Sequence, residues 1–142
     1  ELYDLRAALE TYAIRRATPL ISDEEIATHR HLQQAALEQS QERDTATAEA
    51  FYRADLALHS VLHNLAGNRR STRILSEVMG QLSLLSMRAA TIPEQNQLAI
   101  AEHQAILDAL DARDPDLAAA AMEAHMEAVK GRSLADLEGG IG

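Results

Sequence analysis

The stretch FYRADLALHSVLH, residues 51 to 63, has the apolar periodicity of a helix but carries polar groups on its apolar side. Positions four apart on a helix differ by only about 40° in direction, so Asp55 and His59 project from the same side. Their neighbours on that side include Phe51 and Leu62. A carboxylate and an imidazole that face the core need a partner, because burying an unpaired charge is costly.

The composition around this stretch indicates one helical domain. The chain has 142 residues, enough for a single core, and it contains one Phe, no Trp and only three Pro. Absence of Cys excludes disulfides and thiolate metal sites, and a cytoplasmic location is expected. No apolar run has the length of a membrane span. The formal charge of −9 argues against this chain binding DNA phosphates by itself.

The apolar periodicity predicts an all-α fold of about six helices, without a strand pattern or an internal repeat. The first ends before Pro19, a capping box SDEE opens the second at Ser22, and Gly67-Asn68 forms a left-handed cap after the third. The predicted ranges are 2–18, 22–42, from the end of SQERD to 66, 70–91, 94–113, and from the DPD turn at 114–116 to 137. Residues 139–142 are expected to fray.

The predicted fourth helix, 70–91, is apolar around much of its circumference. Ile74, Leu75, Val78, Leu84 and Met87 do not fit on one stripe, together with Met79, Leu82 and Leu85. Such a helix should be buried on two sides, in the centre of the fold or at a subunit interface. A homodimer is therefore expected.

Two further histidines lie on apolar stripes of other predicted helices. His103 is one turn from Ile100 and Ile106, and His125 follows Ala121 and precedes Val129. A single histidine on such a stripe is usually a hydrogen-bonded core residue, and His29, His31 and His63 are assigned to that class. His63 continues the face of His59 and could instead support a ligand.

The four residues Asp55, His59, His103 and His125 together suit a divalent cation, since burying them without one would be costly. Three imidazoles and a carboxylate point first to Zn²⁺, with Ni²⁺ or Mn²⁺ as alternatives, and leave one or two positions for water or a ligand oxygen. Such a site could also serve a small metal-dependent hydrolase. Its general base would be His63, because Glu102 points about 100° away from His103.

Three segments resemble the C-terminal ligand-binding domain of the FadR subgroup of GntR-type transcription regulators, the FCD domain. They are LYDLRAALETYAIRRAT, FYRADLALHSVLHNLAGN and AEHQAILDALDARDPDLAAAAMEAHM, and the resemblance covers residues 1–138. It implies an antiparallel helical bundle with a central metal and effector pocket, in which Asp55, His59, His103 and His125 hold the metal. It also implies a small organic acid that completes the coordination.

The same resemblance implies an effector-sensing domain, not an enzyme, that modulates DNA binding. Full-length members carry an upstream winged helix-turn-helix domain that binds operator DNA as a dimer, and we expect that domain to be missing here. Arg6 matches an arginine that reaches the effector carboxylate in some members, and Arg88 resembles a second such position. A dimerisation module without an effector would instead have its pocket filled by side chains.

Local charge defines the expected effector. A divalent ion with three neutral ligands and one carboxylate keeps a net positive charge, so an anionic ligand is favoured although the whole chain is acidic. The metal and Arg6 together suit a small hydroxy-carboxylate or a sugar acid rather than a long acyl chain.

Overall fold

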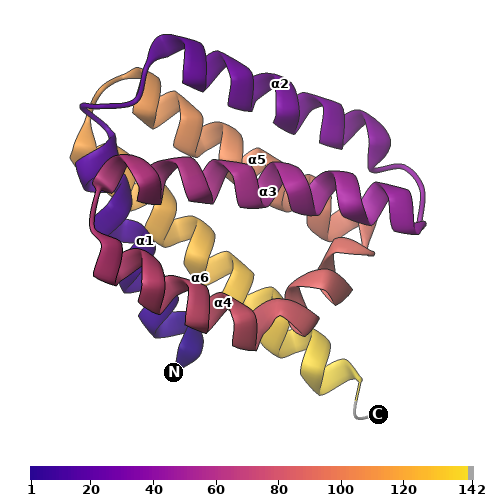
Figure 1. The fold of residues 1–142 in the computed structure, drawn as a ribbon. Coiled ribbons are helices and arrows are strands. Elements are labelled where there is room, and N and C mark those ends of the chain that lie inside the picture. The colour runs from indigo at the N-terminus through magenta and orange to yellow at the C-terminus, as the bar shows by residue number, and fades with distance from the viewer. Residues whose placement is uncertain (141–142) are drawn as a thin grey trace.

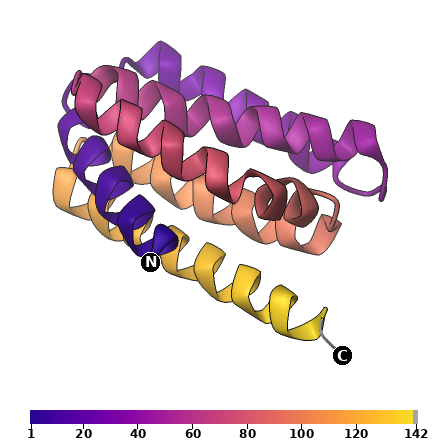
Figure 2. The same ribbon diagram turned by 60° about the horizontal axis from the view of Figure 1, so that its bottom comes forward.

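The computed structural model describes residues 1–140, which form six α-helices joined by short loops (Figure 1). The helices are α1 (Leu2–Ala17), α2 (Asp23–Gln39), α3 (Thr45–Ala66), α4 (Arg69–Ala90), α5 (Pro93–Asp111) and α6 (Pro115–Gly139). Figures 1 and 2 show an antiparallel bundle from which the C-terminal end of α6 projects. The all-α prediction is confirmed, since the described residues contain no strand.

Capping groups fix several of the helix ends. Ser22 Oγ accepts from the backbone N–H of Glu25 at 3.0 Å, and the Glu25 carboxylate accepts from the backbone N–H of Ser22 at 2.9 Å, so the predicted capping box is confirmed. Gly67 ends α3 with φ at 68°, a left-handed conformation that favours glycine. Asn68 does not extend that cap as predicted; its side chain instead accepts from the backbone N–H of Ser71 and begins α4.

Two helix ends differ from the sequence prediction. Helix α2 ends at Gln39 rather than near residue 42, because the backbone turns at Ser40, whose hydroxyl donates to the Leu37 carbonyl at 2.7 Å. Helix α6 continues to Gly139, so the expected fraying does not begin there. The remainder of the predicted tail, residues 141 and 142, lies outside the described residues.

The core consists of two clusters of buried side chains. The larger joins α1, α3, α5 and α6 through residues that include Ile14, Leu58, Leu107 and Met122. The smaller includes Phe51, Ala90, Ala99 and Ile100. The Phe51 ring stacks on the imidazole of His103, with their centroids 6.5 Å apart, so polar groups lie beside the smaller cluster.

Helix α4 buries only one of the two faces that were expected to be covered. Leu75, Val78 and Leu82 are buried, while Ile74, Leu84 and Met87 are 42%, 81% and 58% exposed. Among the described residues, nothing covers these three side chains, so the rest of the bundle does not bury the predicted second side of α4. No helix of the described residues, α4 included, combines the length and apolarity needed to cross a membrane.

Candidate metal and effector site

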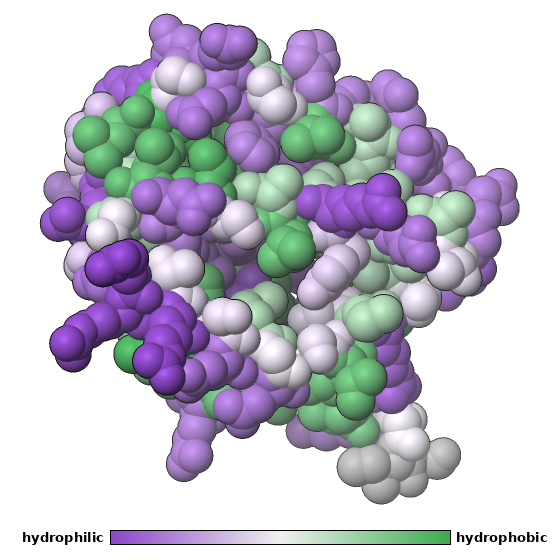
Figure 3. Space-filling view, viewed as in Figure 1, coloured by the Kyte–Doolittle hydropathy of each residue, from purple (hydrophilic) through white to green (hydrophobic). Residues whose placement is uncertain are grey.

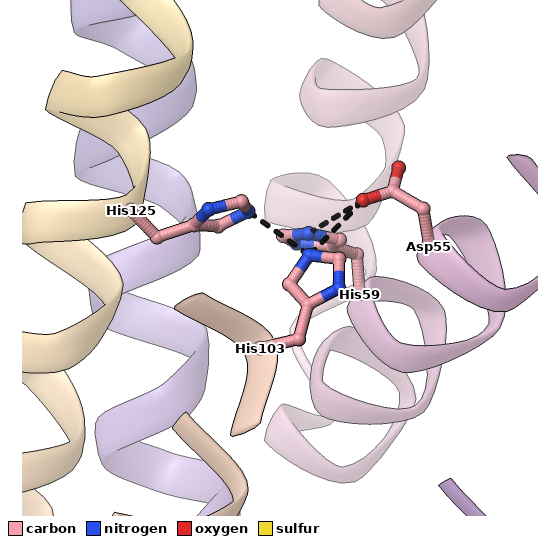
Figure 4. Close-up of side chains that lie close together, drawn as sticks. All are labelled: Asp55, His59, His103 and His125. Atoms are coloured by element: carbon pink, nitrogen blue, oxygen red, sulfur yellow. Dashed lines mark hydrogen bonds and ion pairs between the residues drawn. The ribbon is translucent and has the colours of Figure 1, made fainter. Parts of the chain in front are cut away.

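Four side chains from three helices converge inside the bundle. Helix α3 supplies Asp55 and His59, α5 supplies His103, and α6 supplies His125 (Figure 4). One ligand atom from each lies within 4.8 Å of the others. The three imidazoles are almost completely buried, and the Asp55 side chain is 19% exposed. The structure thus brings together all four residues that the sequence predicts as metal ligands.

The inward-facing atoms of this cluster are three ring nitrogens and one carboxylate oxygen. Asp55 Oδ1 lies 3.2 Å from His103 Nε2 and 3.5 Å from His59 Nε2. His103 Nε2 is 3.1 Å from His125 Nε2. The rings of His59 and His125 are stacked with centroids 5.5 Å apart. The cluster therefore presents Nε2 of each histidine and one carboxylate oxygen to a common centre.

The opposite ring nitrogens contact acceptors from neighbouring helices. His103 Nδ1 lies 2.8 Å from Gln33 Oε1, and the Gln33 amide nitrogen donates to the Ala54 carbonyl, which turns its oxygen towards the ring. His125 Nδ1 lies 2.7 Å from a carboxylate oxygen of Glu102. With its proton on Nδ1, each imidazole keeps its Nε2 lone pair for the centre, as metal-binding histidines do.

The third clustered histidine, His59, faces a carboxylate of α1. His59 Nδ1 lies 3.1 Å from Glu10 Oε1, a contact that is close but not aligned as a hydrogen bond. His59 Nε2 is buried and makes no hydrogen bond within the described residues. With both rings protonated on Nδ1, the Nε2 lone pairs of His103 and His125 would face each other at 3.1 Å. A divalent cation would satisfy these atoms, so the donor set fits the metal that the sequence predicts.

Burial and the surrounding carboxylates set the protonation of the cluster. Burial lowers the pKa of His103 and lowers that of His125 to about 4, so both rings are neutral at pH 7. Burial also opposes the charged form of His59, but Glu10 and Asp55 outweigh it and raise the pKa of His59 to about 9. The pKa of Asp55 lies well below its ordinary value despite burial, because His59 and His103 favour the carboxylate.

The site predicted from the sequence does not include three residues whose side chains contact the Nδ1 atoms of the clustered histidines: Glu10, Gln33 and Glu102. Glu10 is fully buried on the stripe of α1 that also carries Ala13 and Ile14. A charged residue on an apolar stripe is the sequence signal that could have identified it. Glu102 does point away from its neighbour His103, as expected, but it reaches His125 on the next helix. The crossing of α5 and α6 decides that contact, and periodicity does not describe helix crossings.

The remaining predicted site residues occupy different surroundings. His63 is buried, and its Nε2 lies 3.0 Å from Glu10 Oε2. His63 and His59 therefore contact the same carboxylate. Arg6 is 4% exposed and its Nε lies 3.4 Å from Glu10 Oε1. Arg88 is directed to Asp136, with 3.4 Å between Nε and a carboxylate oxygen. Arg6 and His63 therefore lie beside the cluster, because both contact Glu10, which also contacts His59. Arg88 lies apart from the cluster.

Two cavities adjoin the cluster, and Arg6 and Asp55 line both. One of about 60 Å³ is also lined by His125 and Arg132. The other, of about 230 Å³, lies between α1, α3 and α4, and Figure 3 shows the molecular face that carries α3 and α4. Side chains do not fill this space, contrary to what a dimerisation module without an effector requires. Arg88 lines neither cavity.

Comparison with known proteins agrees with this architecture. Residues 1–128 match the FCD domain. The HTH-type transcriptional repressor NanR of Salmonella schwarzengrund (strain CVM19633) is 33% identical over 128 residues, which cover 88% of this chain and 46% of that protein. NanR of Salmonella newport (strain SL254) is 32% identical over 128 residues, 88% of this chain and 47% of that protein.

The chain spans about half the length of the curated relatives it matches. These relatives are transcriptional repressors, not enzymes. The family match covers α1 to α5 and most of α6, and includes all four clustered side chains. The chain therefore belongs to the FCD domain family and is related to the GntR-family NanR repressors.

Proposed function

We propose that this domain senses a small organic acid through a bound divalent metal and thereby modulates DNA binding by an N-terminal domain outside this chain. The main support for this proposal is that three histidine Nε2 atoms and one carboxylate oxygen converge beside Arg6, a buried arginine that lines two cavities. Membership of the FCD family and the repressor relatives support a regulatory role.

Asp55, His59, His103 and His125 are the proposed metal ligands. The nitrogen-rich set favours Zn²⁺, with Ni²⁺ or Mn²⁺ as alternatives. Glu10, Gln33 and Glu102 hold the three rings with their Nε2 atoms inward. When bound, the ion would supply a positive centre to which a carboxylate oxygen binds.

Arg6 is the proposed second anchor for the acid. Its guanidinium has one hydrogen bond within the described residues, Nε to Glu10, which leaves the terminal nitrogens for a ligand. A buried guanidinium with free donors favours a carboxylate, which can accept two parallel hydrogen bonds.

The preference for a small acid comes from the metal and Arg6. The larger cavity has both polar residues (Ser60, Asn64, Ser76) and apolar residues (Leu56, Leu75, Met79) in its lining, next to Arg6 and Asp55. A hydroxy-carboxylate or sugar acid anchored by its carboxylate at this end of the cavity remains the proposed ligand.

The signal would pass between subunits of a homodimer. The outer face of α4 around the exposed Leu84 and Met87 suits burial against a second copy. Helix α4 also lines the cavity of about 230 Å³, so the same helix meets both the ligand space and the proposed interface. A shift of α4 on acid binding would change the spacing of two DNA-binding domains.

Calorimetry with glycolate and gluconate tests the proposal. Either acid should bind the Zn²⁺-loaded domain, bind much more weakly after chelation, and lose roughly tenfold or more in affinity in Arg6→Gln, which removes a charged hydrogen-bond donor. Arg43→Gln is the matched control, because Arg43 is an exposed arginine paired with Glu94 and lines neither cavity. Equal binding with and without metal would disprove the proposed mechanism.

A further inference from the structure

Two of the three clustered histidines are supported by a glutamate that also contacts an arginine. His125 Nδ1 contacts Glu102, and Glu102 accepts from both terminal nitrogens of Arg132 at 2.7 and 2.9 Å. His59 contacts Glu10, which receives Arg6 Nε at the longer distance of 3.4 Å. The Arg132–Glu102 pair is therefore the stronger of the two, since bidentate charge-assisted bonds are short and directional.

The helix geometry explains why these three groups meet. His125 and Arg132 are seven residues apart on α6, which is two turns, so they lie on the same face of that helix. Glu102 of α5 lies between them, and its neighbour His103 enters the cluster. Helix α5 thus supplies one clustered histidine directly and supports a second one on α6.

The two glutamate oxygens divide their contacts unequally. Oε1 of Glu102 receives both His125 Nδ1 and one arginine nitrogen, whereas Oε2 receives only the other arginine nitrogen. Arg132 therefore competes with the imidazole for electron density on the same oxygen. A carboxylate that is less neutralised by arginine makes the opposite ring nitrogen a stronger metal donor.

We propose that Glu102 is a positioning residue for His125 and that Arg132 limits, through Glu102, how strongly His125 binds a metal. This inference rests on the proposed function, because it assumes that the cluster holds a cation. Arg132 also lines the cavity of about 60 Å³ together with Arg6, so the limiting group is exposed to the space beside the cluster.

The test measures the dissociation constant of Zn²⁺ alone, by competition with a chelator, in the 142-residue chain without any acid. Glu102→Gln keeps the size and one acceptor oxygen but removes the charge, and should weaken binding roughly 10-fold to 100-fold. Arg132→Gln should tighten binding by about threefold to tenfold, because Glu102 then serves only His125. A merely structural role for Arg132 predicts weaker binding instead.

A double variant separates action through Glu102 from a direct effect of the arginine charge. In the Glu102→Gln background, Arg132→Gln should change the dissociation constant by less than about twofold, since the carboxylate that transmits its effect is gone. The matched controls Arg73→Gln and Glu77→Gln, in the exposed ion pair of α4, should leave the constant unchanged. Circular dichroism of the metal-free variants verifies that each is folded.

The possible outcomes distinguish the two proposals. A wild-type chain that binds Zn²⁺ while Glu102→Gln binds it equally well overturns this inference and leaves the proposed function in place. Weaker binding in Arg132→Gln, or the same tightening with and without Glu102, overturns it as well. A wild-type chain that binds no metal overturns the proposed function and this inference with it.

Discussion

The cluster of Asp55, His59, His103 and His125 and the outer face of α4 depart in opposite directions from the usual placement of polar and apolar groups. In the cluster, His103 and His125 are 0% and 1% exposed, whereas on α4 the apolar Leu84 is 81% exposed. Within the cluster, the buried Nε2 of His59 has no hydrogen bond among the described residues, which a cation would remedy, and exposed apolar side chains are of the kind that a partner surface covers. Under the proposed function, each region would be completed by a different component, a cation in one case and a second chain in the other.

The largest effect is expected from removal of a clustered histidine. His103→Ala should lower Zn²⁺ affinity by roughly 100-fold or more, since even supporting residues change it by 10-fold to 100-fold. It should also abolish the stabilisation by metal, about 2.7 kcal/mol when free metal is 100 times the dissociation constant. That free energy corresponds to roughly 8 °C in melting temperature for a chain of this size.

Thermal unfolding with and without Zn²⁺ measures this loss. His31→Ala is the matched control, because His31 is exposed and lies outside the cluster. An equal metal-induced rise in melting temperature in His103→Ala and wild type would show that the ion binds elsewhere.

The second region is tested by a charge on the outer face of α4. Leu84→Glu should weaken self-association by roughly 100-fold or more, because two copies each lose the burial of a leucine worth about 1.5–3 kcal/mol. The stability of the isolated subunit should change little, since Leu84 is exposed there.

Sedimentation equilibrium decides whether this face is an interface. Leu117→Glu is the matched control, an equally drastic change at a 51% exposed leucine on α6. A wild-type chain that stays monomeric at micromolar concentration, or a Leu84→Glu chain that associates as well as wild type, would contradict the dimer.

The protonation of His59 predicts a pH dependence that the α4 face should not share. Its pKa is raised to about 9 in the metal-free chain, so a cation must displace a proton below that pH. Zn²⁺ affinity should therefore rise by about tenfold per pH unit between pH 7 and pH 9 and level off above. Chelator competition across this range measures the slope, and an affinity that is independent of pH would show that His59 is not a ligand.

The sign of this shift also predicts the stability of the metal-free chain. The pKa of His59 is raised on folding, so its stabilising contribution is complete below the unfolded value near 6.5 and is lost as the pH rises towards 9. Urea unfolding of the chelated chain at pH 7 and pH 9 should show this loss. Glu10→Gln should reduce it, because Glu10 is the first of the carboxylates that raise the pKa.

The smallest effect is expected at Arg88. Its guanidinium is directed to Asp136, outside both cavities, so Arg88→Gln should change acid affinity by less than about twofold, while Arg6→Gln changes it roughly tenfold. Calorimetry with gluconate compares the two variants. A large loss in Arg88→Gln would restore the role that its sequence position predicts and would place the acid nearer the C-terminal end of α4.

The sequence predicts the four clustered side chains better than it predicts the residues that hydrogen-bond or contact their rings. Asp55 and His59 follow from a spacing of four residues on one helix, which fixes their relative direction. His103 and His125 required the apolar stripes and the family resemblance, because periodicity does not show that three helices meet. Glu10 lay on a stripe of the same kind, yet its contact with His59 depends on how α1 packs against α3.

Helix ends show the same limit. The capping box at Ser22 is a local pattern that the sequence predicts, whereas the predicted end of α2 lies three residues too late, because the polar residues after Gln39 include neither Gly nor Pro as a stop signal. The exposed face of α4 could not be distinguished from a buried one, since the sequence reports apolar content but not which neighbour covers it.

X-ray absorption at the zinc edge of the Zn²⁺-loaded chain tests the central claim most directly. The account predicts one bound ion per chain with three imidazole nitrogens and a carboxylate oxygen at roughly 2.0–2.2 Å. His125→Ala should lower the number of imidazole ligands by one. A first shell of oxygen alone, or an unchanged imidazole signal in His125→Ala, would contradict the assignment of Asp55, His59, His103 and His125 as the metal site.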